Sequence, residues 1–249
     1  MEISLAAETV FRIGSFPVTN TLIASVFTAL VIGLLAFALG RRKPSLKPRG
    51  FQNLMEGIVA WLLGLMDGIT GNRQLTKKMF PFVTTIFLFV VISNWIGIFP
   101  GFGTIGIREV HQGEEVLVPF FRSVNADLNF TLALAIVSVV ATNVLGIVVL
   151  GAFKFAGKFF VNPFKNPIGA FVGLLELIGE LAKLLSFSFR LFGNIFAGEV
   201  LLVVIASLIP YVAPLPFYFL EIFVGFIQAF VFAVLTLVFM RVATVEAEH

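Results

Sequence analysis

The chain has 249 residues, of which 59% are hydrophobic and 12% are charged, and its formal net charge is +3. This composition excludes soluble domains and indicates a membrane protein that crosses the bilayer several times, with no sign of nucleic acid binding. There is no cysteine, and the two histidines, His111 and His249, lie outside apolar segments, so we expect no disulfide, no metal cluster and no cofactor.

The N-terminal part predicts one span followed by a basic segment. Residues 1–19 are polar enough to lie outside the bilayer. Residues 20–39 carry no charge and are long enough to cross it. Five basic residues and no acidic residue lie between Arg41 and Arg49. The positive-inside rule therefore places this segment in the cytoplasm and the N-terminus outside. Binding of anionic phospholipid is a second interpretation of the segment, and both can hold.

The next elements alternate between interface and span. Residues 50–70 mix apolar and acidic side chains, which predicts an amphipathic interfacial helix, with a poor spanning helix as the alternative. Residues 79–99 predict a second span. The region from Arg108 to Asp127 is the most acidic and is expected on the extracytoplasmic side. Asp127 either caps the following helix or lines an aqueous entrance.

The last part of the chain contains a run too long for an upright span. Residues 128–153 predict a third span, but residues 167–209 then continue without an internal proline. A helix of that length extends about 63 Å, about twice the hydrocarbon core. It either breaks near Gly179 or Gly193 or lies strongly tilted. After a proline-rich turn, residues 217–241 predict a second helix that runs back in the opposite direction.

These elements predict an all-α polytopic membrane protein. We expect a single integral membrane domain over residues 1–249, with about five membrane helices and one interfacial helix.

The stretch from Leu184 to Leu202 holds the residue that is most expensive to bury, Arg190. A guanidinium at mid-bilayer costs roughly 3 kcal/mol on insertion scales, and an arginine cannot lose its proton to escape that cost. A functional role is therefore the default interpretation. The alternative is an arginine neutralised by Glu176 or Glu180 inside a static bundle.

Polar residues accompany Arg190 at helical spacing. Glu176, Glu180, Lys183 and Asn194 would share its stripe on one helix. On the returning segment, two polar residues a heptad apart, Glu221 and Gln228, share a face and could oppose that stripe. The plain alternatives are a Gln228 amide satisfied by neighbouring backbone and a Glu221 carboxylate paired with some cation.

The decapeptide RLFGNIFAGE, from Arg190 to Glu199, resembles the signature of subunit a of F-type ATP synthases, the membrane stator beside the rotating c-ring. Gln228, Asp127, the NPF at Asn162 to Phe164 and the Glu-His ending also resemble bacterial members. The likeness covers most of the chain and is strongest from residue 160 onward.

The resemblance implies a non-catalytic subunit that carries protons through two offset aqueous half-channels against the c-ring. Arg190 would drive deprotonation of the c-ring carboxylate and block leak, and Asn194 and Gln228 would orient Arg190 or water. Glu199 and Glu221 would gather or relay protons in one half-channel, and Glu176 and Glu180 would serve the cytoplasmic one. Many bacterial relatives carry histidine where Glu221 stands, so this chain departs from the family's pattern there.

The resemblance also implies a setting. The implied partners are the c-ring, the peripheral stalk subunit b and membrane lipid. The implied place is the plasma membrane of a bacterium, with the N-terminus outside and the C-terminus in the cytoplasm. The helices over residues 167–209 and 217–241 would form a strongly tilted hairpin that curves around the ring.

Three other functions compete with this interpretation. A sodium-driven version of the same machine is the nearest, because ion choice depends largely on c-ring ligands that this chain does not contain. A secondary transporter that binds an anion at Arg190 predicts a discontinuous helix pair and an internal repeat, and the sequence has neither signal. An intramembrane hydrolase would need Ser-His or paired metal ligands at membrane depth, and no histidine lies in a predicted span.

Overall fold

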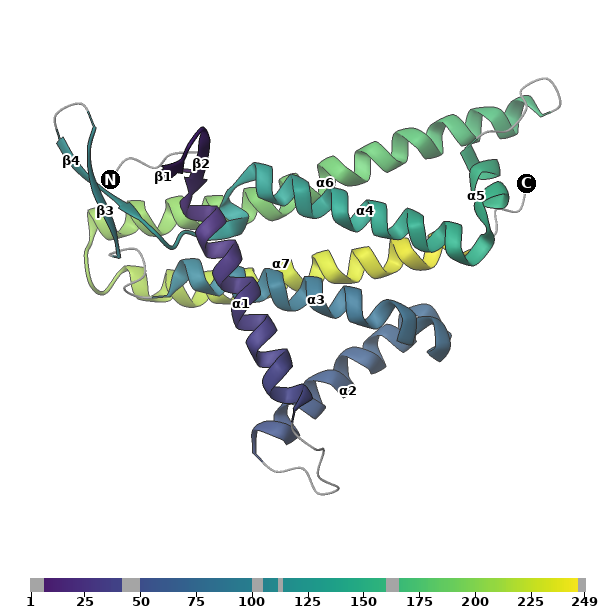
Figure 1. Ribbon diagram of the computed structural model, residues 1–249, viewed down its shortest axis with the longest axis horizontal. Coiled ribbons are helices and arrows are strands. Elements are labelled where there is room, and N and C mark those ends of the chain that lie inside the picture. The colour runs from purple at the N-terminus through teal and green to yellow at the C-terminus, as the bar shows by residue number, and fades with distance from the viewer. Residues whose placement is uncertain (1–6, 42–49, 100–104, 112–113, 160–165, 246–249) are drawn as a thin grey trace. The chain divides into compact units, whose positions relative to one another are not determined.

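The computed structural model describes residues 7–41, 50–99, 105–111, 114–159 and 166–245 (Figure 1). Within these ranges, five helices are long and apolar enough to cross a membrane: α1 (Asn20–Gly40), α3 (Arg73–Ile98), α4 (Leu128–Leu150), α6 (Pro167–Leu208) and α7 (Pro214–Ala243). The predicted all-α polytopic fold is confirmed. Helix α2 (Phe51–Thr70), at the predicted interfacial position, is not among the five.

Short elements connect the long helices. Two antiparallel hairpins, which the sequence analysis did not predict, pair β1 (Thr9–Ile13) with β2 (Phe16–Thr19) and β3 (Gly106–His111) with β4 (Glu114–Pro119). A 3-10 turn, η2 (Val124–Ala126), precedes α4, and the short helix α5 (Ala152–Phe159) follows it.

Polar side chains set the starts of three long helices by capping free backbone N–H groups. The Asn72 side-chain oxygen accepts hydrogen bonds from the N–H groups of Gln74 and Leu75 at the start of α3. Asp127 accepts from the N–H of Asn129 at 2.9 Å, so the capping interpretation of Asp127 is confirmed. Asn166 accepts from the N–H of Gly169 at 2.9 Å, next to a proline that suits the first turn of α6.

Helix α6 runs without interruption for 42 residues. A break near Gly179 or Gly193 is therefore excluded. The helix ends before Pro210, and Tyr211 adopts φ 77° in the turn to α7. Helix α4 ends earlier than the predicted span because Gly151 leaves the helical region with φ 86°.

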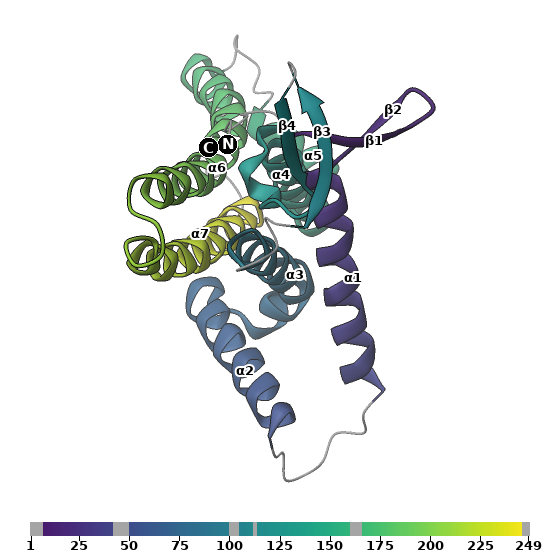
Figure 2. The same ribbon diagram turned by 90° about the vertical axis from the view of Figure 1, so that its left-hand side faces the viewer.

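The chain divides into two compact units, and the long helices contribute to both. The first unit consists of residues 1–47, 85–131 and 189–231. In it, α7 lies between α6 and α3 (Figure 2). Two hydrogen bonds attach α3 to α7: the Asn94 amide donates to the carbonyl of Gly225 at 2.9 Å, and the Trp95 indole donates to that of Ile222 at 3.1 Å.

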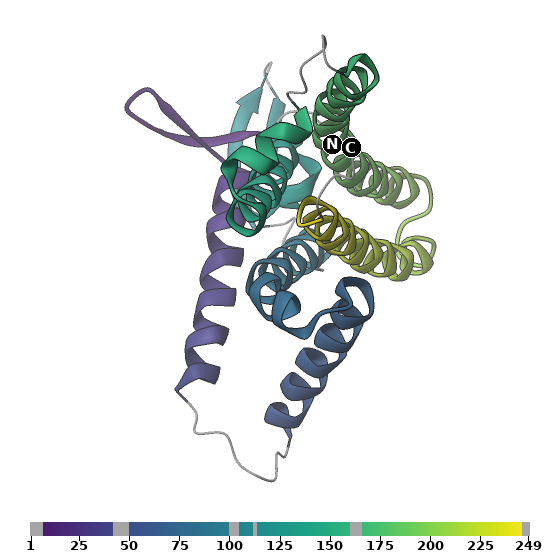
Figure 3. The same cartoon turned by 90° about the vertical axis from the view of Figure 1, so that its right-hand side faces the viewer.

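The second unit consists of residues 48–84, 132–188 and 232–249. Its α2 leads into the start of α3 through a tight turn at Gly71, which adopts the left-handed conformation with φ 64° (Figure 3). The hydroxyls of Ser138 and Thr236 lie 2.9 Å apart and join α4 to α7. Aromatic contact of Phe187 with Phe232, at 4.9 Å between ring centroids, packs α6 on α7.

Candidate functional site

Arg190 lies on an exposed face of α6 in the first unit. Asn194, one turn later, is exposed as well, and so are the small residues Gly193 and Ala197 beside it. The opposite flank, with Leu191 and other apolar residues, is buried. The face around Arg190 therefore presents a permanent cation, an amide and little side-chain bulk. Such a face allows a partner helix to approach closely.

Glu199 points to a different side of the same helix. It follows Arg190 by nine residues, which at 100° per residue places it about half a turn away from Arg190. Its two carboxylate oxygens accept hydrogen bonds from Nε of Arg122 at 3.0 and 3.2 Å. Arg122 is 7% exposed and the Glu199 side chain 32%. Arg190 and Glu199 are therefore directed to separate surroundings.

Glu221 lies on α7, 5% exposed, directly against Gly198 of α6. A Cβ at position 198 would overlap the Glu221 carboxylate, so a larger residue there would force that carboxylate to move. Glu221 also interacts electrostatically with Glu199. The structure thus brings together the two carboxylates that were predicted to share one half-channel.

Gln228 follows two turns after Glu221 and is half-buried. Among the described residues, none is hydrogen-bonded to its amide, so the interpretation of a backbone-satisfied amide gains no support.

A group of buried polar residues connects α3 with the segment before α4. The Asn125 amide donates to the side-chain oxygen of Asn94 at 2.7 Å, and both side chains are fully buried. Three buried oxygens in this group, those of Ser93, Ser123 and the Asn125 amide, have no hydrogen-bond partner among the described residues. Buried polar atoms in this state usually contact ordered water.

The other two predicted carboxylates belong to the second unit. Glu180 pairs with Lys183 at 2.5 Å and accepts a 3.5 Å hydrogen bond from the Asn143 amide of α4. The Lys183 ammonium also lies 4.8 Å from the centre of the Phe239 ring. Glu176 is half-buried one turn earlier on α6. Glu180 is therefore the anion of a local ion pair.

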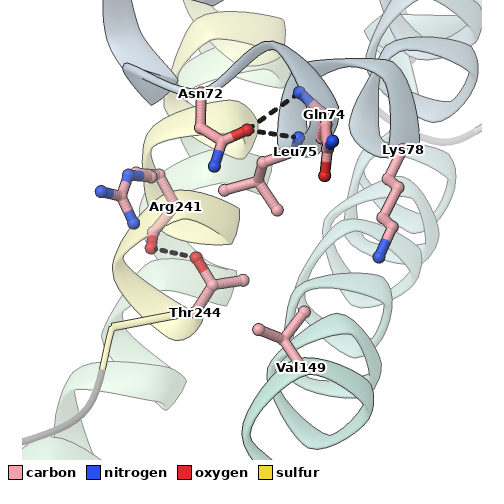
Figure 4. Close-up of a pocket in the computed structure, with 7 residues that line it drawn as sticks. All are labelled: Asn72, Gln74, Leu75, Lys78, Val149, Arg241 and Thr244. Atoms are coloured by element: carbon pink, nitrogen blue, oxygen red, sulfur yellow. Dashed lines mark hydrogen bonds between the residues drawn. The ribbon is translucent and has the colours of Figure 1, made fainter.

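A pocket of about 270 Å³ opens in the second unit where the start of α3 meets the ends of α4 and α7 (Figure 4). The pocket is lined by seven residues: Asn72, Gln74, Leu75 and Lys78 at the start of α3, Val149 of α4, and Arg241 and Thr244 at the end of α7 and just after it. None of the predicted site residues is among them.

Several contributors were not assigned by the sequence analysis. Arg122 is separated from Glu199 by 77 residues, and no spacing rule connects them. Asn94 and Asn125 stand out only as amides near the ends of apolar runs. Gly198 lies inside the recognised decapeptide, but the sequence did not indicate that Glu221 would lie against it. The predicted NPF, the residues from 42 to 49 and the Glu-His ending lie outside the described residues.

Known proteins match this chain over most of its length. The sequence model of the family described as ATP synthase A chain matches residues 22–241. ATP synthase subunit a of Campylobacter jejuni is 36% identical over 218 residues, which cover 88% of this chain and 87% of that protein. The protein of the same name from Campylobacter fetus is 34% identical over 230 residues, 92% of each chain. That of Syntrophobacter fumaroxidans is 35% identical over 206 residues, 81% of this chain and 74% of the relative.

Proposed function

We propose that this chain, which belongs to the ATP synthase A chain family, is the proton-conducting stator subunit a of a rotary F-type ATP synthase. It is a multi-pass membrane protein, and in this proposal it conducts ions and has no catalytic site of its own. The observation on which the proposal depends most is Arg190, a permanent cation exposed on the face of a long apolar helix. Because a charge in an apolar membrane helix is energetically unfavourable, its presence indicates a functional interaction with an anionic group.

The partner is a carboxylate carried by the rotating c-ring. When a protonated carboxyl arrives beside Arg190, the guanidinium favours its ionised form and the proton leaves. The same cation repels a proton that would cross directly from one half-channel to the other. Lysine would serve less well, because a desolvated amine can lose its charge. Asn194 on the same face, and Gln228 on α7, orient Arg190 or water without titrating.

Glu199 and Glu221 form the extracytoplasmic route to the ring. Both are carboxyl groups that can take up and release protons, and they lie close enough to interact. The side-chain oxygens of Ser93, Ser123 and Asn125, which have no hydrogen-bond partner within the described ranges, support a hydrated approach, since each costs about 1–3 kcal/mol unless water satisfies it.

Glu176 and Glu180 serve the cytoplasmic half-channel. Both residues lie in the part of α6 before Arg190, and both carry carboxyl groups that can exchange protons. The Lys183 pairing of Glu180 holds that carboxylate in place at the rim.

Family membership and the charge pattern support the following setting. The membrane is the plasma membrane of a bacterium, the N-terminus lies outside, and the C-terminus lies in the cytoplasm. The partners are the c-ring, the peripheral stalk subunit b and membrane lipid. Helices α6 and α7 form a strongly tilted hairpin against the ring, and α2 lies at the interface.

The test is ATP-driven pumping by the assembled enzyme in inverted vesicles. Arg190→Ala should abolish acidification, while Leu201→Ala, a neutral change on the same exposed face, should leave it nearly intact. Glu221→Gln should slow acidification without abolishing it. Normal pumping by Arg190→Ala would refute the proposal. Acidification that requires added sodium, or sodium uptake in its place, would favour the sodium-driven version.

A further inference from the structure

Arg122 is a buried cation for which the half-channel chemistry described above has no role. It lies between β4 and η2, outside the long helices, yet only 7% of its side chain is exposed. Burial of a guanidinium is unfavourable unless an anion with good geometry compensates it. The compensating anion is Glu199, and the Arg122 Nε lies within 3.2 Å of both of its oxygens. The contact orients the Glu199 carboxylate and also compensates its negative charge.

The segment that carries Arg122 is firmly held. Ser123, Val124, Asn125 and Ala126 are all buried. The ideal Cβ position of Gly97 on α3 falls 2.5 Å from the Cβ of Ser123, so the backbones of α3 and this segment touch. Asp127 at the end of the segment accepts a 3.1 Å hydrogen bond from Thr21 of α1. Arg122 is thus presented from a rigid base.

The carboxylate held by Arg122 has acidic neighbours. Glu8, in the stretch before β1, and Glu221 on α7 both interact electrostatically with Glu199. Glu8 is itself 3.5 Å from the amide of the buried Asn20. Arg122 is a cation that pairs with this acidic group through Glu199. Without it, like charges would push the Glu199 side chain away from Glu221.

We propose that Arg122 is a positioning residue for ion conduction, which holds the Glu199 carboxylate beside Glu221 so that an ion passes between the two. This inference rests on the proposed function. It assigns to the extracytoplasmic segment before α4 a direct part in the conducting path, through one side chain.

The experiment measures ATP-driven acidification in inverted vesicles, with the amount of assembled enzyme determined in each preparation. Arg122→Gln should lower the rate about 10-fold or more at normal assembly, because it leaves the half-buried Glu199 carboxylate without this cation. Arg122→Lys keeps the charge and should recover most of the rate. Equal losses for Gln and Lys would mean that Arg122 acts by packing, and an unchanged rate for Arg122→Gln would mean that it does nothing for conduction. Either result overturns the proposal.

A double-variant comparison separates positioning from structure. If Arg122 acts through Glu199, the pair Arg122→Gln with Glu199→Gln should pump no more slowly than Glu199→Gln alone. Losses that multiply would contradict the inference. The double variant leaves no unpaired charge, so it remains informative if Arg122→Gln alone does not assemble. Arg190→Ala in the same vesicles distinguishes the two claims, because pumping by that variant would refute the proposed function itself.

Discussion

Replacement of Gly198 by alanine tests whether Glu221 works from the position that the structure gives it. The added Cβ would overlap the carboxylate at the flexible end of the Glu221 side chain, so that carboxylate must shift within surroundings that leave it only 5% exposed. Overpacking of this kind costs about 1–3 kcal/mol. If the carboxylate leaves its position to avoid that cost, its native placement becomes roughly 5- to 150-fold less populated.

The assay is ATP-driven acidification in inverted vesicles, with Gly33→Ala as the matched control. Gly33 is a helical glycine of the same unit, and a Cβ there would meet nothing within 4 Å. We expect Gly198→Ala to slow pumping at least about fivefold and Gly33→Ala to leave it unchanged. Adding Glu221→Asp, which shortens the side chain by one methylene, should restore part of the rate. Equal rates for Gly198→Ala and Gly33→Ala would refute the reasoning.

Three further changes test other parts of the structure. Gln228→Ala should slow pumping but leave a measurable rate, because the amide carries no charge; complete loss would show that its role is not merely orienting. Asn94→Ala removes the hydrogen bond to α7 and should lower the free energy of unfolding by about 1–3 kcal/mol, measured in detergent against Thr84→Ala; equal effects would contradict this. The Thr76 hydroxyl and the Arg73 guanidinium lower the pKa of Asp67 below its usual value. The stabilisation is therefore present at neutral pH and is lost progressively as the pH falls from about 4 through the lowered pKa of Asp67. Asp67→Asn should lower the melting temperature more at pH 7 than near pH 3, and an equal decrease at both would argue against stabilisation by the ionised carboxylate.

The long hairpin could be predicted because it depends on local signals. Helix α6 and its end could be predicted from two features of the sequence. No proline lies between Pro167 and Pro210, and the composition of this run is apolar. The excess length also excluded an upright span. Whether the helix broke at Gly179 or Gly193 could not be decided, because glycine in a helix costs only about 1 kcal/mol and packing decides the outcome.

The candidate site was predictable only in part. Arg190 could be predicted as a site residue because burial of its charge in an apolar run is energetically unfavourable. Asn194 could be predicted because its spacing places it on the same helix face. Arg122 could not be assigned, because its partnership with Glu199 depends on how a connecting segment folds back on α6. The space that Gly198 leaves for Glu221 is likewise a tertiary fact, since nothing in the sequence says which helix lies over that glycine.

The barrier role of Arg190 is tested most directly by passive proton flux through the membrane sector with the ring chemically blocked. Vesicles are stripped of the soluble ATPase, and a carbodiimide modifies the c-ring carboxylates so that rotation stops. The wild type should then be tight to protons, because Arg190 separates the two half-channels. Arg190→Ala should conduct protons under the same conditions. If the blocked Arg190→Ala sector is as tight as the blocked wild type, Arg190 is not the barrier, and the account is contradicted at its centre.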